Sequence, residues 1–255
     1  MIINHNISAI NTNRNMGLNQ VASSKNMEKL SSGLRINRAA DDAAGLSISE
    51  NMRGQIRGLE QAQRNTQDGI SFVQTAEGAL NEVSAMLTRM KELNVQKTNG
   101  TYQTADKDNI DQELNALGSQ IKDITEKTTF NGITITAGAT ITTDDKGTSI
   151  VIGAIATTDF GTVSSGSDLA AINKAITSVA TERGKLGAIQ NRLEYTSNNL
   201  GTTTENLTAS ESRIRDTDMA KEMVALTKNN ILLQASQSML AQANSAPQGV
   251  LSLLR

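Results

Sequence analysis

The sequence predicts a mainly α-helical fold. We expect an elongated antiparallel coiled coil or helical bundle built from both termini, with a small β-hairpin region at the middle of the chain. Apolar residues recur at steps of three and four over long stretches, and only one segment is rich in Thr, Ile, Val and Gly. A single proline among 255 residues permits long helices, and five aromatic residues give little bulk for a compact domain with a pocket.

The first long helix is predicted from Ser47 to Thr98, where Asn99-Gly100 provides a stop signal. At roughly 50 residues it far exceeds the mean helix of about 11–12 residues. A second helix follows a short connection and should run antiparallel to the first. Its apolar positions alternate steps of four and three: Ile110, Leu114, Leu117, Ile121 and Ile124.

The segment 130–168 differs, because Ile133 and Ile135 alternate with Thr and Asp144-Asp-Lys-Gly147 has turn composition. It predicts two or three short strands that form a hairpin. The next segment carries a strict seven-residue repeat, which is typical of supercoiled helices. The repeat positions are Ile172, Val179, Leu186, Leu193, Leu200, Leu207 and Ile214.

The two ends of the chain share a composition. Residues 1–27 and 223–255 contain no acidic residue and are rich in Asn and Gln. Both carry helical apolar stripes, and a buried amide at a helix seam fixes register at a cost in stability. We infer that the termini pair with each other and with copies of themselves. The assembly core predicted from these stripes and from the C-terminal tail is Ile3, Ile7, Ile10, Leu226, Leu233, Leu240, Val250, Leu251, Leu253 and Leu254.

Composition excludes several classes of function. There is no cysteine and one histidine, so thiolate metal sites, disulfides and histidine clusters are excluded. The chain has 24 basic and 26 acidic residues, so no net positive charge attracts nucleic acid. Separately, no uninterrupted apolar run is long enough to span a membrane. The N-terminus lacks the pattern of an ordinary signal peptide.

We predict no enzyme, cofactor or metal site. Ser119-Gln-Ile-Lys122 is a chance match to Ser-x-x-Lys, and Asp41-Asp42 is a helix-capping pair rather than a metal site.

Several long motifs, in order, resemble bacterial flagellin. They include MIINHNISAINTNRN at the start, residues 31–83, FNGITI, LGAIQNRLEYTSNNL, SRIRDTDMAKEM and the tail AQANSAPQGVLSLLR. The resemblance covers almost the whole chain and implies a short flagellin that has the filament core without large outer domains. It implies self-assembly into the extracellular helical filament used for motility, after secretion through the flagellar export channel without a signal peptide.

The resemblance also implies a division of the chain. A terminal axial coiled-coil domain, 1–33 with 216–255, makes the inner tube, and 34–46 connects it to the next part. An outer helical bundle comprises 47–129 and 167–215, and 130–166 is a surface-exposed hairpin tip. The implied partners are other copies, an export chaperone and the export apparatus, and the filament cap and hook-associated junction proteins.

One predicted surface combines spacing with the resemblance. Arg89, Leu93 and Gln96 share one helix face because they are spaced by four and three residues. The resemblance adds Glu113 and Ile214, and implies contact with neighbouring subunits and with the animal flagellin-sensing Toll-like receptor. Two readings compete with a filament subunit. A hook–filament junction protein has similar ends but should not grow long filaments, and a soluble coiled-coil adaptor should form discrete oligomers.

Overall fold

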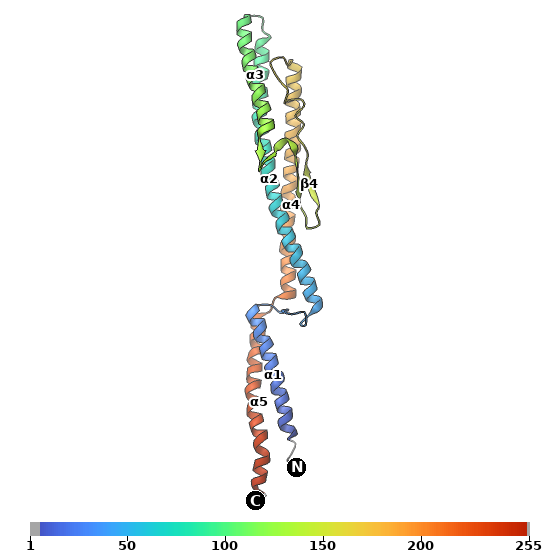
Figure 1. Ribbon diagram of the computed structural model, residues 1–255, viewed down its shortest axis with the longest axis vertical. Helices are drawn as coiled ribbons and strands as arrows, with labels where there is room; N and C mark the ends of the chain where they lie inside the picture. The colour runs from blue at the N-terminus through green and yellow to red at the C-terminus, as the bar shows by residue number, and fades with distance from the viewer. Residues whose placement is uncertain (1–5, 254–255) are drawn as a thin grey trace. The chain divides into compact units, whose positions relative to one another are not determined.

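The computed structural model describes residues 6–253, except for the side chains of 247, 248 and 250–253. Long helices dominate and small antiparallel strand pairs occupy the middle of the chain, which confirms the predicted fold class (Figure 1). The helices are α1 (Ile7–Ser32), α2 (Ala43–Lys97), α3 (Thr104–Lys127), α4 (Leu169–Arg215) and α5 (Met219–Leu253). Between α3 and α4 lie β1 (Thr129–Phe130), β2 (Ile133–Thr134), the 3₁₀ turn η1 (Ile135–Ala137), β3 (Ala139–Thr142) and β4 (Ser149–Ile152).

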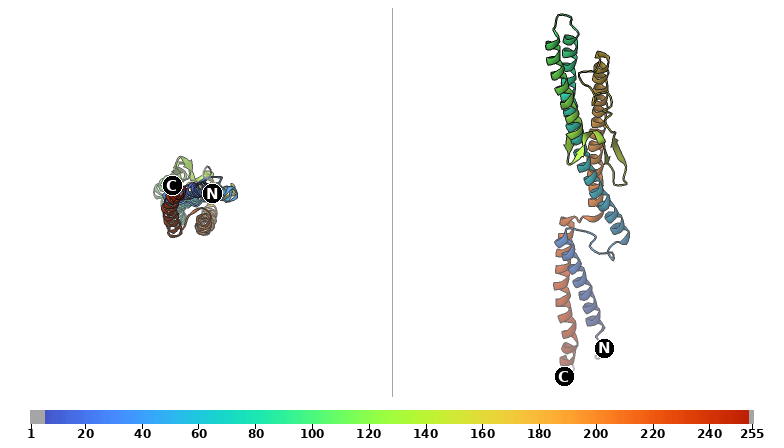
Figure 2. Two further views of the ribbon diagram at one scale, coloured as in Figure 1. Left: turned by 90° about the horizontal axis from the view of Figure 1, so that it is seen from below. Right: turned by 45° about the horizontal axis from the view of Figure 1, so that its top comes forward.

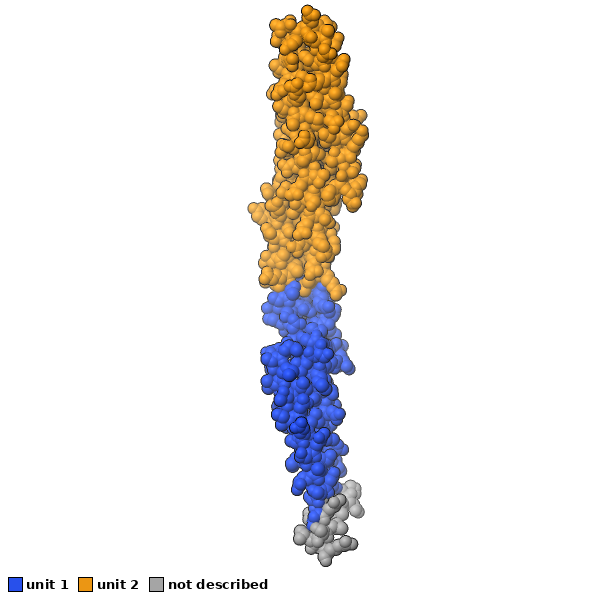
Figure 3. Space-filling model, turned by 90° about the vertical axis from the view of Figure 1, so that its left-hand side faces the viewer, with its two compact units in different colours: residues 1–54, 207–255 blue, residues 55–206 orange. Residues whose placement is uncertain are grey.

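The chain divides into two compact units, which Figure 3 colours separately. The first unit contains residues 1–54 and 207–255, and the second contains residues 55–206. Helices α2 and α4 each contribute to both units. The division between the units therefore falls within these two helices.

Helix α2 begins four residues earlier than predicted, because Asp42 caps its first turn. Asp42 Oδ1 accepts a hydrogen bond from the Gly45 backbone N–H at 2.8 Å. Asp41 Oδ2 accepts from the N–H groups of Arg38 and Asn37, at 3.0 and 3.2 Å. The Arg38 hydrogen bond holds the pKa of Asp41 below its usual value. Asp42 thus satisfies a backbone donor of the first helical turn, as the capping interpretation predicts, whereas Asp41 binds the segment that precedes the helix.

The second unit is a helical bundle in which α3 and α4 both run antiparallel to α2. Lys97 of α2 pairs with Asp111 and Arg89 pairs with Glu113, so positions along α2 and α3 run in opposite directions. Arg183 of α4 reaches Glu77 of α2 at 3.5 Å. One connected cluster of buried apolar side chains forms the core of this unit: Phe72, Val73, Ala76, Leu80, Val83, Leu87, Met90, Leu93, Ile110, Leu114, Ile121, Ile135, Ile150, Ile152, Ile155, Phe160, Val163, Ile172, Ala175, Val179, Leu186 and Leu193.

The seven-residue repeat of α4 is buried over most of its length. Ile172, Val179, Leu186 and Leu193 belong to the core of the second unit, and Leu200 is also buried. The last two repeat positions, Leu207 and Ile214, are only half-buried and lie in the first unit.

The middle segment forms two separate two-stranded sheets where one hairpin was expected. β1 pairs with β2 around the turn Asn131-Gly132, whose φ angles of 49° and 79° are typical of a type I′ hairpin turn. β3 pairs with β4, with Ile141 opposite Ile150. This second sheet lies against α2, because a Cβ added at Gly69 would come within 2.9 Å of Ile141 Cγ1. Packing on α2 thus gives the second sheet its own position, which strand spacing alone does not predict.

Candidate assembly and recognition surfaces

Helices α1 and α5 of the first unit pack side by side through a polar seam (Figures 1 and 2). Ser23 Oγ donates to Asn230 Oδ1 at 3.0 Å, and the Asn6 side-chain amide donates to the Ala243 carbonyl at 2.6 Å. Ser23 is buried in the seam. The side-chain amide Nδ2 of Asn19 donates a hydrogen bond to Ser236 Oγ at 3.4 Å. The amide-rich termini therefore contact each other, and hydrogen bonds of their polar side chains recur along the seam.

The predicted apolar stripe of α1 faces away from α5. Ile7 and Ile10 are each 61% exposed, so they do not pack in this seam. On α5, Leu226, Leu233 and Leu240 are half-buried toward α1. Ile3, Leu254 and the side chains of Val250, Leu251 and Leu253 lie outside the described residues. The exposed large apolar residues of these two helices are Ile7, Ile10, Leu18, Val21, Met27, Met219, Met223, Val224, Ile231, Leu232 and Met239.

Sequence reasoning did not identify which face of α1 contacts α5. The signal was present in the polar residues, because Asn19, Ser23 and Asn26 recur near one helical face. A search for apolar stripes passes over such a face, since amides and hydroxyls count as surface residues. The result leaves an apolar row on α1 with no covering element within the described chain.

Backbone hydrogen bonds tie the two chain segments of the first unit together. Gly33, with φ +73°, ends α1, and its carbonyl accepts from the Thr217 N–H at 3.0 Å. The Arg35 N–H donates to the Arg215 carbonyl at 2.6 Å, and the Arg35 guanidinium Nε donates to the Ile214 carbonyl at 3.1 Å. The Arg215 guanidinium in turn binds the Glu50 carboxylate. This cluster fixes the ends of α1 and α4 against the start of α2.

The Glu50–Arg215 contact should respond to acid. The hydrogen bond from Arg215 lowers the pKa of Glu50 below its ordinary value of 4.5. A lowered folded-state pKa stabilises the fold above the ordinary value, and that stabilisation is lost as pH falls through the folded pKa. Amide protection at Arg35 and Thr217, measured by hydrogen exchange, should therefore weaken on acidification. Glu50→Gln should remove this step and the exposed control Glu60→Gln should keep it. An identical pH profile in Glu50→Gln contradicts the assignment.

Arg89, at the predicted recognition face, lies between two carboxylates. Its Nη1 is 3.1 Å from Glu92 Oε2, and its Nε is 3.1 Å from Glu113 Oε1. The hydrogen bonds that Arg89 donates, chiefly the one to Glu92 and then the one to Glu113, raise the pKa of Arg89. Gln96 Nε2 donates to the Tyr102 hydroxyl at 3.2 Å. The Arg89, Glu92, Gln96 and Glu113 side chains are exposed, so an external partner can reach a guanidinium whose position is already fixed.

The other two residues of the predicted face lie elsewhere. Leu93 is 2% exposed and belongs to the core, so it offers almost no accessible surface. Ile214 belongs to the first unit, where its carbonyl accepts from Arg35. Asn94, the neighbour of Leu93, is buried and donates to the Ser167 carbonyl at 3.0 Å. The described structure thus brings Arg89, Gln96 and Glu113 together in one unit.

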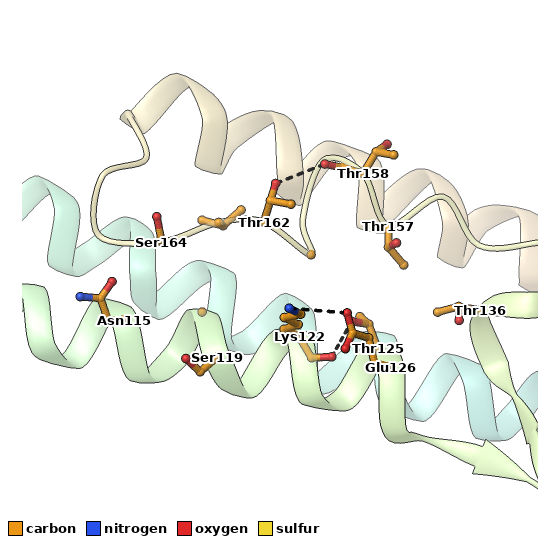
Figure 4. A pocket seen from close by; sticks show the side chains of 13 residues that line it. Asn115, Ser119, Lys122, Thr125, Glu126, Thr136, Thr157, Thr158, Thr162 and Ser164 are labelled. Atoms are coloured by element: carbon orange, nitrogen blue, oxygen red, sulfur yellow. Dashed lines mark hydrogen bonds and ion pairs between the residues drawn. The ribbon is translucent and has the colours of Figure 1, made fainter.

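A polar hollow of about 720 Å³ lies between α3 and the segment 157–164 (Figure 4). Ser119 and Lys122, the chance match to a catalytic pair, both line it. Lys122 is 60% exposed and lies 3.9 Å from Glu126. A Ser–Lys pair needs a desolvated amine that can act as a base, whereas Lys122 is hydrated and beside a carboxylate. The hollow is a space between packed elements with the wrong environment for nucleophilic catalysis.

Hydropathy bears on the helices as well. Within residues 6–253, no helix is both long and apolar enough to cross a membrane.

Family models and full-length relatives match this chain over nearly its whole length. A family model described as the bacterial flagellin N-terminal helical region matches residues 3–140, and the C-terminal helical region matches residues 169–254. Flagellin of Bacillus subtilis (strain 168) is 49% identical over 304 residues, with 100% of both chains covered. The flagellar filament 33 kDa core protein of Treponema phagedenis is 45% identical over 286 residues, again with 100% of both chains covered.

A solved structure shares the fold. The putative flagellar hook-associated protein from Vibrio parahaemolyticus matches with a TM-score of 0.59 and 15% identity, over 69% of this chain and 100% of that chain. At this identity the likeness concerns the fold alone. The two family regions and the full-length relatives carry the assignment: the chain belongs to the bacterial flagellin family.

Proposed function

We propose that the chain is a structural subunit of the bacterial flagellar filament, in which copies associate through the exposed apolar residues of α1 and α5. The observation that carries the proposal is the set of exposed apolar residues on the face of α1 that does not contact α5. Burial of each such side chain contributes about 1.5–3 kcal/mol. Several such residues supply enough to offset an association cost of about 4–15 kcal/mol. The full-length relative from Treponema phagedenis named as a filament core protein supports the same function.

Association of this kind joins different surfaces on successive copies. A contact between unlike surfaces that does not close a ring produces an open helical polymer. In the proposal, the terminal domain, 1–33 with 216–255, makes the inner tube, the outer bundle surrounds it and the hairpin tip faces solvent. The apolar tail around Leu253 and Leu254 is proposed to become buried when copies assemble.

The proposed route to the filament is export through the flagellar channel. We expect an export chaperone to cover the apolar C-terminal end before export. The filament cap and the hook-associated junction proteins are the expected neighbours of assembled copies. These partners follow from family membership together with the apolar residues that a free subunit exposes.

Seeded growth tests the proposal. Purified monomers are added to short filament seeds and imaged by negative-stain electron microscopy. Long smooth filaments that grow from the seeds are expected. Short rings would favour the junction protein, and uniform small oligomers would favour a coiled-coil adaptor. Either of these outcomes contradicts the filament-subunit assignment.

We further propose that the free monomer binds the animal flagellin-sensing Toll-like receptor through Arg89, Gln96 and Glu113. The exposed, carboxylate-anchored guanidinium of Arg89 favours this face, since arginine is enriched at interface hot spots. Arg89→Ala should reduce receptor-dependent cell signalling by monomers at least about tenfold, because a lost hot spot costs about 2 kcal/mol or more. Its circular dichroism should stay unchanged. Full signalling by this variant, with the exposed control Arg192→Ala also active, removes Arg89 from the site.

A further inference from the structure

The chain contains two Asn-Gly pairs in very different settings, Asn99-Gly100 and Asn131-Gly132. Asparagine followed by glycine is chemically reactive, because no side chain shields the glycine nitrogen from the asparagine side-chain carbon. Reaction requires that nitrogen to reach the side-chain carbon, so the backbone and side chain at the pair must rotate. The local structure therefore decides which of the two pairs reacts.

Asn99 lies in the exposed connection between α2 and α3 (Figure 1). Its Oδ1 accepts a hydrogen bond from the Thr101 backbone N–H at 3.3 Å. This contact closes a ring that contains the Gly100 nitrogen, so it keeps the side-chain carbonyl on the same side of the turn as that nitrogen. It also draws electron density from the side-chain carbon, which favours nucleophilic attack.

We propose that Asn99 is a site of spontaneous deamidation in the folded protein. Hydroxide removes the proton from the Gly100 nitrogen, which forms a bond to Cγ of Asn99. The Cγ–Nδ2 bond breaks, and the nitrogen takes a proton from water and leaves as ammonia. Water then opens the resulting five-membered imide at either carbonyl and yields aspartate or isoaspartate. The net reaction consumes one water, releases one ammonia and adds one negative charge at neutral pH.

Asn131 is held in a conformation that opposes the same reaction. Its φ of 49° and the φ of 79° at Gly132 define the tight turn between β1 and β2. Thr129 pairs with Thr134 and Phe130 with Ile133 on either side of the turn. Phe130 also packs edge-on against Phe72, with ring centroids 5.9 Å apart. Rotation at Asn131 therefore requires local opening of the strand pair, which adds to the barrier.

The chemistry makes the α2–α3 connection progressively more acidic with the age of the protein. The Asn99 N–H donates to the Gln96 carbonyl, so the new charge arises one helical turn beyond Gln96. The isoaspartate product also inserts one extra carbon into the main chain of the connection. The inference rests on local geometry and does not depend on the proposed function.

Peptide mass spectrometry tests the proposal. The folded protein is incubated at neutral and mildly alkaline pH and then digested with trypsin. Peptides 98–107 and 128–146 each contain one asparagine, so each reports on one pair. We expect the mass change of amide-to-acid conversion to appear at least about tenfold faster in 98–107, equivalent to about 1.4 kcal/mol of barrier. In denaturant the two rates should converge, because both pairs are then free to rotate.

Gly100→Ala is the matched control. A Cβ added at Gly100 meets no atom within 4 Å, and its φ is not left-handed, so the fold should be retained. The added methyl group hinders attack by the residue-100 nitrogen and should slow deamidation at Asn99 about tenfold or more. Equal rates at Asn99 and Asn131 in the folded protein overturn the proposal. An unchanged rate in Gly100→Ala also overturns it.

Discussion

Replacing Ile10 and Ile231 by serine is expected to stop filament growth at monomer concentrations that support the unmodified chain. Ile10 lies on α1 and Ile231 on α5, and each is 61% exposed in the single chain. The double variant loses burial worth about 1.5–3 kcal/mol at each position on assembly. The critical concentration should therefore rise about 10²–10⁴-fold, since about 1.4 kcal/mol corresponds to a factor of ten. Sedimentation of seeded mixtures measures this threshold directly.

The control for this prediction is Val151→Ser. Val151 of β4 is also 61% exposed, but it belongs to the second unit and to neither α1 nor α5. Its substitution should leave the threshold within about threefold of the unmodified value, as surface changes usually alter energies by no more than about 0.5 kcal/mol. Equal thresholds for the unmodified chain and the double variant would show that assembly uses another surface. Because Ile10 and Ile231 are exposed, the helix content of the monomer should not change.

Gly118→Ala is expected to destabilise the second unit by about 1–3 kcal/mol, the usual cost of overpacking a filled interior. A Cβ at Gly118 would lie 2.3 Å from the Val163 carbonyl oxygen, so α3 and the segment 157–167 would have to separate. That segment is anchored, because Ser165 N–H donates to Asn115 and Asn94 donates to the Ser167 carbonyl. The clash should outweigh the gain of about 1 kcal/mol in helix propensity that alanine brings.

The matched substitution is Gly184→Ala on α4, where an added Cβ meets no atom within 4 Å. There the helix-propensity gain of about 0.5–1 kcal/mol should stand alone and stabilise the unit. Because the chain has two units, a global unfolding curve does not report on the second unit alone. Hydrogen exchange at the buried Leu114 and Ile121 of α3 reports on the second unit itself. Slower exchange in Gly118→Ala would mean that the segment moves without cost.

The sequence predicts the long helices well, because their apolar repeats are regular and extend over many turns. The seven-residue repeat of α4 correctly identifies the buried positions from Ile172 to Leu200. Capping is correctly assigned to Asp42, since its hydrogen-bond partner Gly45 is three residues away in the first turn of α2. Local patterns succeed in these cases because the interaction partners are near in the sequence.

Features that depend on distant partners could not be predicted. The side chain of Asn6 binds the Ala243 carbonyl, 237 residues away, and nothing local distinguishes this amide from the solvated ones near it. Arg89 and Leu93 are four residues apart on one helix. Leu93 is buried in the core, whereas Arg89 is exposed and pairs with Glu113, because α3 covers only part of that face. Periodicity identifies positions that share a side, and packing decides how much of that side remains accessible.

The exposed apolar residues of α1 and α5 give association between copies its own dependence on temperature. The α1–α5 contact inside a copy differs, because it includes the side-chain hydrogen bonds of Asn6, Asn19 and Ser23 beside the half-buried leucines of α5. Covering Ile7, Ile10 and their exposed apolar neighbours removes hydrocarbon from water, which carries a large negative heat-capacity change and an entropic driving force near room temperature. Moderate warming therefore strengthens contacts between copies until the helices themselves melt. Cooling weakens the polymer while the α1–α5 hydrogen bonds inside each copy persist.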